Sequence, residues 1–306
     1  MKSYVIGVDV GGTNIKLGLV HARGNVIART SFPTKLFISN KTKLINALAL
    51  EVQAIVAWAG VPKKNIAGVG IGLPGLIDHH KGLVRFLPNI PGWRNVRLKH
   101  ILQQKLKLPV FIDNDVKLIT LAEWKFGAGK GADHMVCLTL GTGVGSGLIL
   151  GGRLYRGQAN AAGELGHMPL NETGPACNCG GFGCLESYIG NSRLVARANA
   201  LMGRRDMTLE KMFRLASDGN KKALAFWQEA ATHLGNGLVA VVNLLNPRLI
   251  VIGGGVSNNH KFLFKTARAV IARRAMGTQS AAVRVVRAAL GDDAGIIGAQ
   301  VLVHNA

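Results

Sequence analysis

One pattern occurs twice in the chain: a short β-branched strand, a turn that contains glycine, and a second strand. The first turn is Gly11-Gly12-Thr13 and the second is Gly141-Thr142-Gly143, roughly 130 residues further on. Alternating strand and helix patterns follow each copy, which is typical of α/β units. The sequence therefore predicts two similar α/β halves, although glycine turns between strands are common in many folds.

The composition is that of a globular chain that can bury a sizeable core. Of the 306 residues, 48% are hydrophobic and 17% are charged, and the 40 glycines follow no three-residue period. Disorder, collagen and coiled coil are therefore excluded. The longest uncharged stretch, residues 135–152, is broken by glycines, so no membrane span is expected. The N-terminus does not resemble a secretory signal, and a cytoplasmic location is expected.

Basic residues outnumber acidic residues, with 37 Lys and Arg against 16 Asp and Glu, for a formal charge of +21. Such a surplus suits polyanions, including nucleotides, polyphosphate and nucleic acid. The basic residues are scattered in small groups and form no tail. An ordinary basic surface would explain the charge equally well.

Apolar runs between glycine and proline breaks predict the regular elements. Strands are expected at residues 4–9, 15–21, 25–30, 67–71, 109–112, 135–140, 147–150, 249–252 and 283–286. Helices are expected at residues 43–58, 97–106, 116–126, 230–245 and 292–304, with residues 201–246 mostly helical.

Three glycine motifs could bind a nucleotide. In the first, DVGGTNIK at residues 9–16, backbone N–H groups and the Thr13 hydroxyl could surround phosphate oxygens, and Asp9 could hold Mg²⁺ directly or through water. The second, LGTGVGSG, predicts a glycine loop at residues 141–147. The third, GGGVS at residues 253–257, offers a flat surface for a base or ribose. Ordinary tight turns would account for each motif as well.

Asp113, Asn114 and Asp115 end a predicted strand, where α/β sheets commonly bind ligands. A carboxylate at this place can accept a proton from an alcohol that attacks phosphorus, and Asn114 can orient a hydroxyl. The same residue types are equally suited to capping the N-terminus of the next helix.

A histidine and three cysteines form the most specific motif: His167, Cys177, Cys179 and Cys184. Their number and type match a closed tetrahedral Zn²⁺ site, which leaves no open position for catalysis and is therefore structural. The alternative is a buried cysteine cluster. Glu164 and Glu186 flank the motif and could accept hydrogen bonds from sugar hydroxyls, or could be surface carboxylates.

Together these motifs resemble the ROK family of sugar kinases and related repressors, and within it the ATP-dependent glucokinases. The resemblance extends from Tyr4 to the end of the chain. It depends on residues 9–16, residues 140–147, GELGH at residues 163–167 and CNCGGFGCLE at residues 177–186. It implies an α/β fold of two RNase H-like domains, as in the actin and hexokinase superfamily, around a central cleft. We expect a smaller domain of residues 1–118, joined by the C-terminal helix 292–306, and a larger domain of residues 119–291 that carries the zinc loop.

The resemblance also implies a role for each motif. Asp115 would be the catalytic base, and His167 would place one ring nitrogen on zinc and the other against a sugar hydroxyl. The sugar-binding residues would be Asn89, Asn114, Asp115, Glu164, His167 and Glu186. The ATP and Mg²⁺ site would comprise Asp9, Gly11, Gly12, Thr13, Asn14, Lys16, Gly141, Thr142, Gly143, Gly254 and Gly255. The zinc ligands would be His167, Cys177, Cys179 and Cys184. A homodimer is implied as well.

One position departs from the family pattern. The family usually has Asn-Asp-Ala-Asn after the strand, whereas this chain has Asn114-Asp115-Val116-Lys117. The base is kept, but Lys117 replaces the second asparagine. It could pair with an acidic neighbour or lie near phosphate.

The sequence thus predicts an ATP-dependent kinase that phosphorylates the 6-hydroxyl of glucose. The shared motifs do not distinguish glucose from N-acetylmannosamine, N-acetylglucosamine, mannose, fructose or allose. Polyphosphate is an alternative donor, although the polyphosphate-using family members lack this cysteine cluster. A sugar-responsive DNA-binding repressor is disfavoured, and no nucleic-acid partner is expected, because the phosphate motif begins at Asp9 and leaves no room for a preceding helix-turn-helix.

Overall fold

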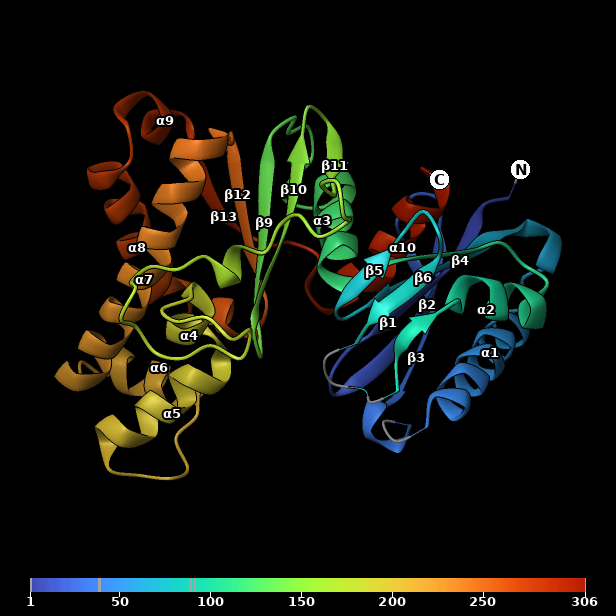
Figure 1. Cartoon of the computed structure of the whole chain (residues 1–306), viewed down its shortest axis with the longest axis horizontal. Helices are drawn as coiled ribbons and strands as arrows, with labels where there is room; N and C mark the ends of the chain where they lie inside the picture. Colours follow the sequence, from blue (N-terminus) through green and yellow to red (C-terminus); the bar gives the residue numbers. More distant parts are fainter. Residues whose placement is uncertain (1, 38–39, 88–89, 91, 306) are drawn as a thin grey trace. The chain divides into compact units, whose positions relative to one another are not determined.

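The computed structural model of the protein describes residues 2–37, 40–87, 90 and 92–305 (Figure 1). The chain divides into two compact units. Unit 1 comprises Met1–Lys130, Leu154–Ala162 and Leu290–Ala306, and unit 2 comprises Gly131–Arg153 and Gly163–Ala289.

Each unit is built on a five-stranded sheet. In unit 1 the order is β3-β2-β1-β4-β8, formed by β1 (Tyr4–Val10), β2 (Asn14–His21), β3 (Val26–Pro33), β4 (Ile66–Leu73) and β8 (Val110–Asn114). In unit 2 the order is β11-β10-β9-β12-β13, formed by β9 (Met135–Leu140), β10 (Val144–Leu150), β11 (Arg153–Tyr155), β12 (Leu249–Gly253) and β13 (Arg284–Arg287). Each sheet starts with an antiparallel hairpin and continues with two strands parallel to the first. The repeated sequence pattern therefore corresponds to a repeated topology.

Helices cover both faces of the unit 1 sheet. Alternate apolar residues of β1 and β2 face α1 (Lys41–Trp58) and α2 (Leu98–Leu106) and form one core with them. The opposite face meets α3 (Asp115–Phe126) and α10 (Ala294–His304). Glycines make this second face flat: a Cβ on Gly7 would lie 2.2 Å from the carbonyl oxygen of Ile296. Because glycine has no side chain, α10 can pack directly on the backbone of the sheet, and no larger residue would fit there.

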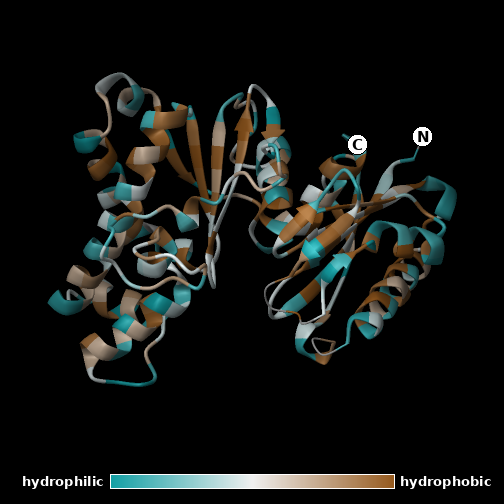
Figure 2. Ribbon diagram, in the orientation of Figure 1, coloured by the Kyte–Doolittle hydropathy of each residue, from teal (hydrophilic) through white to brown (hydrophobic). Residues whose placement is uncertain are grey.

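The core of unit 2 lies between its sheet and a group of helices. These are α4 (Leu185–Ile189), α5 (Asn191–Met202), α6 (Leu209–Ser217), α7 (Lys221–Leu245), α8 (His260–Arg274) and α9 (Gly277–Ala282). The long helix α7 buries a stripe that includes Phe226, Trp227 and Leu234 in a core to which strands β9 and β12 also contribute. Figure 2 shows the hydrophobic residues concentrated on the strands and on the inner faces of the helices.

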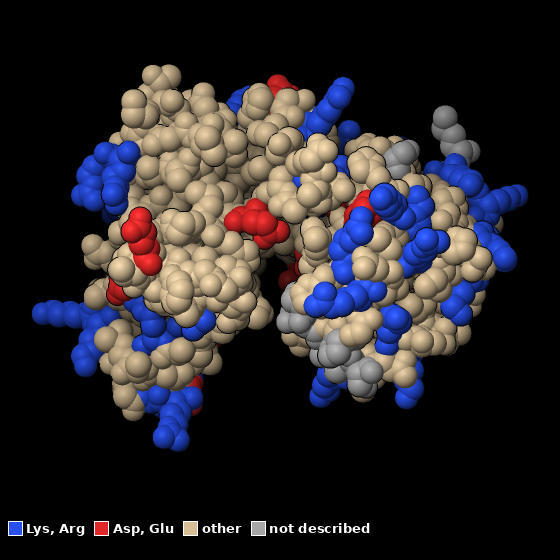
Figure 3. All heavy atoms as spheres, viewed as in Figure 1, with Lys and Arg blue, Asp and Glu red and all other residues tan. Residues whose placement is uncertain are grey.

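Short 3-10 turns complete the chain: η1 (Thr34–Leu36), η2 (Lys63–Asn65), η3 (Leu165–His167), η4 (Gly255–Asn259) and η5 (Gly291–Asp293). On the face shown in Figure 3, Lys and Arg side chains are scattered over both units. None of the helices in the described part of the chain combines the length and the hydropathy that a membrane span needs.

The structure differs from the sequence-based expectations in several places. A separate antiparallel sheet, β5 (Leu76–Asp78), β6 (Leu83–Phe86) and β7 (Arg94–Val96), was not expected, because its strands are too short to show a clear alternation. Strand β11 and helices α4, α5, α8 and α9 were not expected either. The predicted loop at residues 141–147 is wrong in extent, because β10 begins at Val144 and only three residues form the turn.

The division into units also falls at a different place from the expected boundary at residue 118. Helix α3 belongs to unit 1 as a whole, because it packs on α10: a Cβ on Gly298 would lie 1.9 Å from the carbonyl oxygen of Leu118. The first stretch of unit 1 therefore ends at Lys130, and Leu154–Ala162 belongs to unit 1 as well.

Candidate functional site

Two aspartates lie close together at the carboxyl ends of the parallel strands of unit 1. Asp9 is in β1, and Asp115 is the first residue of α3, directly after β8. Strand β4 lies between these strands, with Gly72 paired opposite Asp9. A Cβ on Gly72 would lie 3.2 Å from the Asp115 Cα, so glycine at this position leaves room for the start of α3.

The surroundings of Asp9 raise its pKa from 3.8 to about 7. Burial is the largest cause, the negative charge of Asp115 adds to it, and Lys16 opposes it. The start of α10 contacts the carboxyl group, since a Cβ on Gly295 would lie 2.5 Å from Asp9 Oδ2. A buried carboxyl beside a second carboxylate, with oxygen atoms as the available ligands, is the donor set that Mg²⁺ prefers.

Asn114 fixes the start of α3 and with it the position of Asp115. The Asn114 Oδ1 accepts hydrogen bonds from the N–H groups of Val116 at 3.0 Å and Lys117 at 3.3 Å, and its Nδ2 donates to the carbonyl of Gly75 at 3.2 Å. The capping role that the sequence left open is therefore present at Asn114. The half-buried Asp115 accepts from the Val116 N–H at 2.9 Å through Oδ1.

A second set of charged residues binds the segment Leu154–Ala162 beside α3. The fully buried Asp113 accepts hydrogen bonds at Oδ2 from Nε and Nη2 of Arg156, both at 2.8 Å. Nδ1 of His79 lies 3.9 Å from the same oxygen, and burial followed by the charge of Arg156 lowers the pKa of His79. Lys117, which is buried, donates from Nζ to the carbonyl of Asn160.

The motif at residues 9–16 forms the hairpin turn between β1 and β2. The N–H of Gly11 donates to the carbonyl of Asn14 at 3.1 Å, and the two residues between them are exposed. Lys16 donates from Nζ to the carbonyl of Asp292 at 3.2 Å and lies 3.9 Å from the carboxylate of the same residue. The Lys16 side chain therefore lies beside the start of the C-terminal helix.

The two glycine motifs of unit 2 lie together at the carboxyl ends of β9 and β12, which are neighbours in the sheet. The N–H of Gly141 donates to the carbonyl of Gly143 at 2.9 Å. Gly254 has a φ of 84°, and a Cβ there would lie 2.5 Å from the carbonyl oxygen of Leu140. Both the backbone conformation and the close approach therefore require glycine at this position.

The two glutamates assigned to sugar binding occupy different surroundings in unit 2. Glu186 is half-buried, and its Oε2 accepts a hydrogen bond from the N–H of Val144 at 2.8 Å, directly after the glycine turn. Glu164 is exposed. Its backbone is held from both sides by Ser146, whose hydroxyl donates to the carbonyl of Gly163 and accepts from the N–H of Leu165.

The four residues of the cysteine and histidine motif come together in unit 2. Their ligand atoms all lie within 4.8 Å of one another. The Nδ1 of His167 is 3.6 Å from the Sγ of Cys177, and the Sγ atoms of Cys179 and Cys184 are 3.7 Å apart. Tetrahedral zinc geometry places two sulfur ligands about 3.8 Å apart and a nitrogen about 3.6 Å from a sulfur. Both the donor set and its spacing therefore fit Zn²⁺.

The thiols of this cluster differ in acidity. Burial raises the pKa of Cys177, but hydrogen bonds with Cys179, His167 and Ser187 outweigh it and lower the pKa to about 7. Burial and the contacts with Cys179 and Cys177 raise the pKa of Cys184 to about 12. Without a cation the cysteines thus compete for ionisation, and a bound divalent metal would favour thiolates at all of them.

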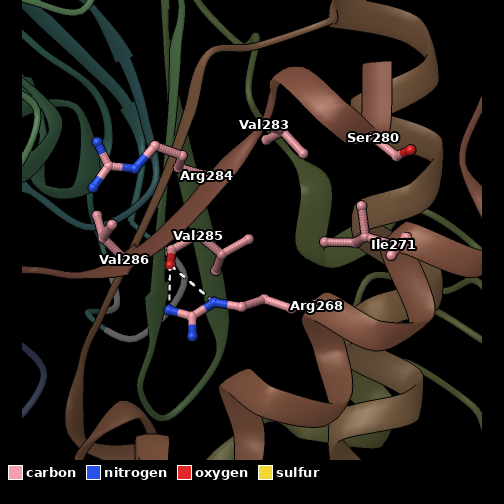
Figure 4. Close-up of a pocket in the computed structure, with 8 residues that line it drawn as sticks. Arg268, Ile271, Ser280, Val283, Arg284, Val285 and Val286 are labelled. Atoms are coloured by element: carbon pink, nitrogen blue, oxygen red, sulfur yellow. Dashed lines mark hydrogen bonds between the residues drawn. The ribbon is translucent and has the colours of Figure 1, made fainter. Parts of the chain in front are cut away.

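Not every predicted residue can be placed at a site. Asn89 lies outside the described residues. A cavity of about 380 Å³ lies in unit 2 between α8, α9 and β13 (Figure 4), where the guanidinium of Arg268 donates to the carbonyl of Val285. Its lining contains none of the predicted site residues, so we do not assign it to the candidate site.

Three contacts around the site were not predicted from the sequence: Arg156 with Asp113, Lys117 with Asn160, and Glu186 with Val144. The partners are 43, 43 and 42 residues apart in the chain. In the last two pairs one partner is a backbone atom, which a residue pattern does not identify.

The ROK family model matches residues 5–306. The chain belongs to the ROK family. It is 34% identical to a glucokinase of Thermotoga maritima, over 99% of this chain and 98% of that protein. It is also 31% identical to a putative xylose repressor of Caldicellulosiruptor, over 98% of this chain and 77% of that protein.

Solved ROK structures share the fold. A ROK hexokinase from Thermus thermophilus is 33% identical with a TM-score of 0.82, covering 99% of this chain and 98% of the other. A ROK glucokinase from Streptomyces griseus in complex with glucose and AMPPNP is 33% identical with a TM-score of 0.81, covering 99% and 100%. The expected fold class, with two RNase H-like units as in actin and hexokinase, is confirmed.

Proposed function

We propose that this ROK protein is an ATP-dependent hexose kinase that phosphorylates glucose at its 6-hydroxyl. The observation that carries the proposal is the pair of carboxyl groups, Asp9 and Asp115, at the carboxyl ends of β1 and β8. It is supported by ROK relatives named glucokinase that match nearly the full length of the chain.

Asp115 is the general base in this proposal. Its carboxylate accepts the proton of the 6-hydroxyl as that oxygen forms a bond to the γ-phosphorus, while the bond from phosphorus to the bridging oxygen breaks and ADP leaves with the electron pair. Asn114 holds the first turn of α3 and so orients the base. Asp9 would hold Mg²⁺, directly or through water, and the cation would neutralise the phosphate charge.

The remaining predicted residues take the roles that the family resemblance implies. In unit 1, Gly11, Gly12, Thr13, Asn14 and Lys16 bind the nucleotide phosphates, and Asn114 contacts the sugar. In unit 2 the nucleotide contacts are Gly141, Thr142, Gly143, Gly254 and Gly255, and the sugar contacts are Glu164, His167 and Glu186. The zinc ligands are His167, Cys177, Cys179 and Cys184. Because Nδ1 of His167 faces the sulfur atoms, Nε2 is the nitrogen that we assign to a sugar hydroxyl. A homodimer and a cytoplasmic location stay predictions.

The test is a coupled ADP-release assay with Mg²⁺ and ATP on zinc-loaded protein. The panel comprises glucose, mannose, fructose, allose, N-acetylglucosamine and N-acetylmannosamine. We expect the highest kcat/KM with glucose. A preference for an N-acetyl sugar would keep the kinase and overturn the substrate. Absence of ADP release with every sugar and ATP, together with absence of sugar phosphate when polyphosphate replaces ATP as donor, would reject the kinase.

A sugar-responsive regulator is the second candidate, because xylose repressors of the family also match most of this chain. The two candidates differ in turnover. Calorimetric binding of a sugar by protein that releases no ADP in the assay would favour the regulator.

A further inference from the structure

Glu186 contacts the turn that connects β9 to β10. Its Oε2 accepts the hydrogen bond from the Val144 N–H at 2.8 Å, and a Cβ on Gly143 would lie only 2.4 Å from the same oxygen. The carboxylate therefore lies against the backbone of the turn itself. Glycine at position 143 is what allows this close contact.

The other end of the turn is held by the residues that follow Glu186. The N–H of Asn191 donates to the carbonyl of Gly141 at 2.9 Å, and a Cβ on Gly190 would lie 3.3 Å from the carbonyl oxygen of Thr142. In a trans peptide the N–H points opposite to the carbonyl, so the Thr142 N–H is directed away from Asn191. Thr142 is also exposed, so we take this N–H to be the donor to a phosphate.

We infer that Glu186 is a positioning residue of the nucleotide site, whose carboxylate holds the turn Gly141–Gly143 in the shape that receives the phosphates of ATP. The inference rests on the proposed nucleotide-binding function of this turn. A carboxylate beside a phosphate site would normally repel the ligand. Here the Oε2 of Glu186 accepts a hydrogen bond from a backbone N–H. The negative charge therefore strengthens a contact that orders the turn.

A residue that contacts only the sugar would behave differently. The distinguishing measurement is the affinity for the non-hydrolysable analogue Mg-AMPPNP by titration calorimetry, on protein without sugar. We expect Glu186→Ala to weaken this affinity about tenfold or more, the factor that corresponds to a lost hydrogen bond to a charged group. Glu186→Gln keeps an oxygen that can accept from Val144 and should stay within about threefold of the parent.

Glu172→Ala is the matched control. It removes an exposed carboxylate of the same unit that has no assigned role at the site and no contact with the turn among the described hydrogen bonds. Its affinity for Mg-AMPPNP should equal that of the parent.

Gly143→Ala tests the same contact from the other side. The added Cβ must displace the Glu186 carboxylate, so the affinity for Mg-AMPPNP should fall. In the Glu186→Ala background the same change meets no carboxylate, so the two losses should not add. Thermal unfolding of each variant establishes that it is folded.

The outcomes separate this inference from the proposed function. Parent-like affinity in both Glu186→Ala and Gly143→Ala, or additive losses in the double variant, would overturn the positioning role and leave the kinase intact. If the folded parent itself binds no Mg-AMPPNP, the nucleotide site is rejected, and the proposed function and this inference fail together.

Discussion

Asp115 lies at the first turn of α3, and the residue before it decides where its carboxyl group lies. Asn114 caps the helix with two accepted hydrogen bonds and also donates to Gly75. Gly72 leaves space for the Cα and Cβ of Asp115, and Gly295 leaves space for the carboxyl group of Asp9. The chemistry of the acidic pair therefore depends on small and capping neighbours as much as on the aspartates.

Replacing the proposed base should remove turnover and retain sugar binding. Asp115→Asn keeps the shape of the side chain but cannot accept the hydroxyl proton, so we expect kcat to fall by about 10²-fold to 10⁴-fold. The coupled assay gives kcat, and calorimetry with glucose gives the affinity. Parent-like turnover in this variant would reject Asp115 as the base.

Asp9 should make stability depend on pH. Because its pKa is about 7 in the folded protein and 3.8 without the fold, the folded state keeps a proton that the unfolded state releases in this interval. The stabilisation by protonated Asp9 is fully present below the lower pKa and lost as pH rises to the upper one. It amounts to about 4 kcal/mol, from about 1.4 kcal/mol per pKa unit.

The measurement is urea unfolding across this interval in metal-free buffer. The unfolding free energy of the parent minus that of Asp9→Asn should decrease as pH rises, since asparagine does not titrate. Parallel pH profiles for the two proteins would show that Asp9 has an ordinary pKa.

At the scale of elements, the segment Leu154–Ala162 is attached to unit 1 by two charged side chains. Arg156 binds Asp113 of β8, and Lys117 of α3 binds the carbonyl of Asn160. Lys117, which departs from the family pattern, thus has a backbone carbonyl as a partner. Pairing of Lys117 with an acidic neighbour or with phosphate stays a prediction.

Lys117→Met keeps the aliphatic stem and removes the donor. We expect the free energy of unfolding to fall by about 1–3 kcal/mol, because a partly buried carbonyl loses a charged partner. Lys125→Met is the matched control, since Lys125 is exposed on the same helix and should change stability by less than about 0.5 kcal/mol. Equal stability of both variants in urea would contradict the attachment role.

The loop that carries the cysteines should depend on its metal. Elemental analysis is expected to find one zinc per chain, and removal of the metal by a chelator should lower the unfolding temperature by several degrees, since the metal binds the folded state alone. Cys184→Ser should reproduce the loss. A metal-free chain with unchanged Tm would favour the buried cysteine cluster.

At the scale of the whole molecule, Glu123 connects two stretches of unit 1 that are far apart in sequence. Its Oε2 accepts from the Ala128 N–H at 2.9 Å, and its Oε1 accepts from the Leu290 N–H at 2.8 Å. These residues lie next to the points where the chain passes between units, at Lys130 and at Leu290. The side chain is fully buried.

Glu123→Ala should therefore be severely destabilising. Two N–H groups lose their acceptor, so we expect a loss of about 2–4 kcal/mol in urea unfolding. Glu123→Gln retains one oxygen acceptor and should lose less. If alanine costs no more than glutamine, the two hydrogen bonds do not contribute to stability.

Much of unit 1 and of the cysteine and histidine cluster could be predicted from the sequence because the signals are local. The strands that begin near Tyr4 and Met135 are uniform apolar runs. The spacing of the cysteines and the histidine identifies the four candidate metal ligands. The short sheet β5-β6-β7 has no such signal, because three or four residues do not define a period. The boundary of unit 1 depended on α3 packing against α10, which are distant in the chain.

The sequence by itself determined the repeated α/β pattern, the glycine turns, the acidic residues after β8 and the four candidate metal ligands, because each is a choice of residue type at a fixed local spacing. Only the tertiary structure decided that Asp9 lies beside Asp115, that Arg156 and Lys117 hold one segment, and that Glu186 supports the turn at Gly143. These contacts join side chains to backbone atoms or to residues on other strands. The physical reason is that burial, charge proximity and backbone approach are set by how strands and helices pack, which no local spacing encodes.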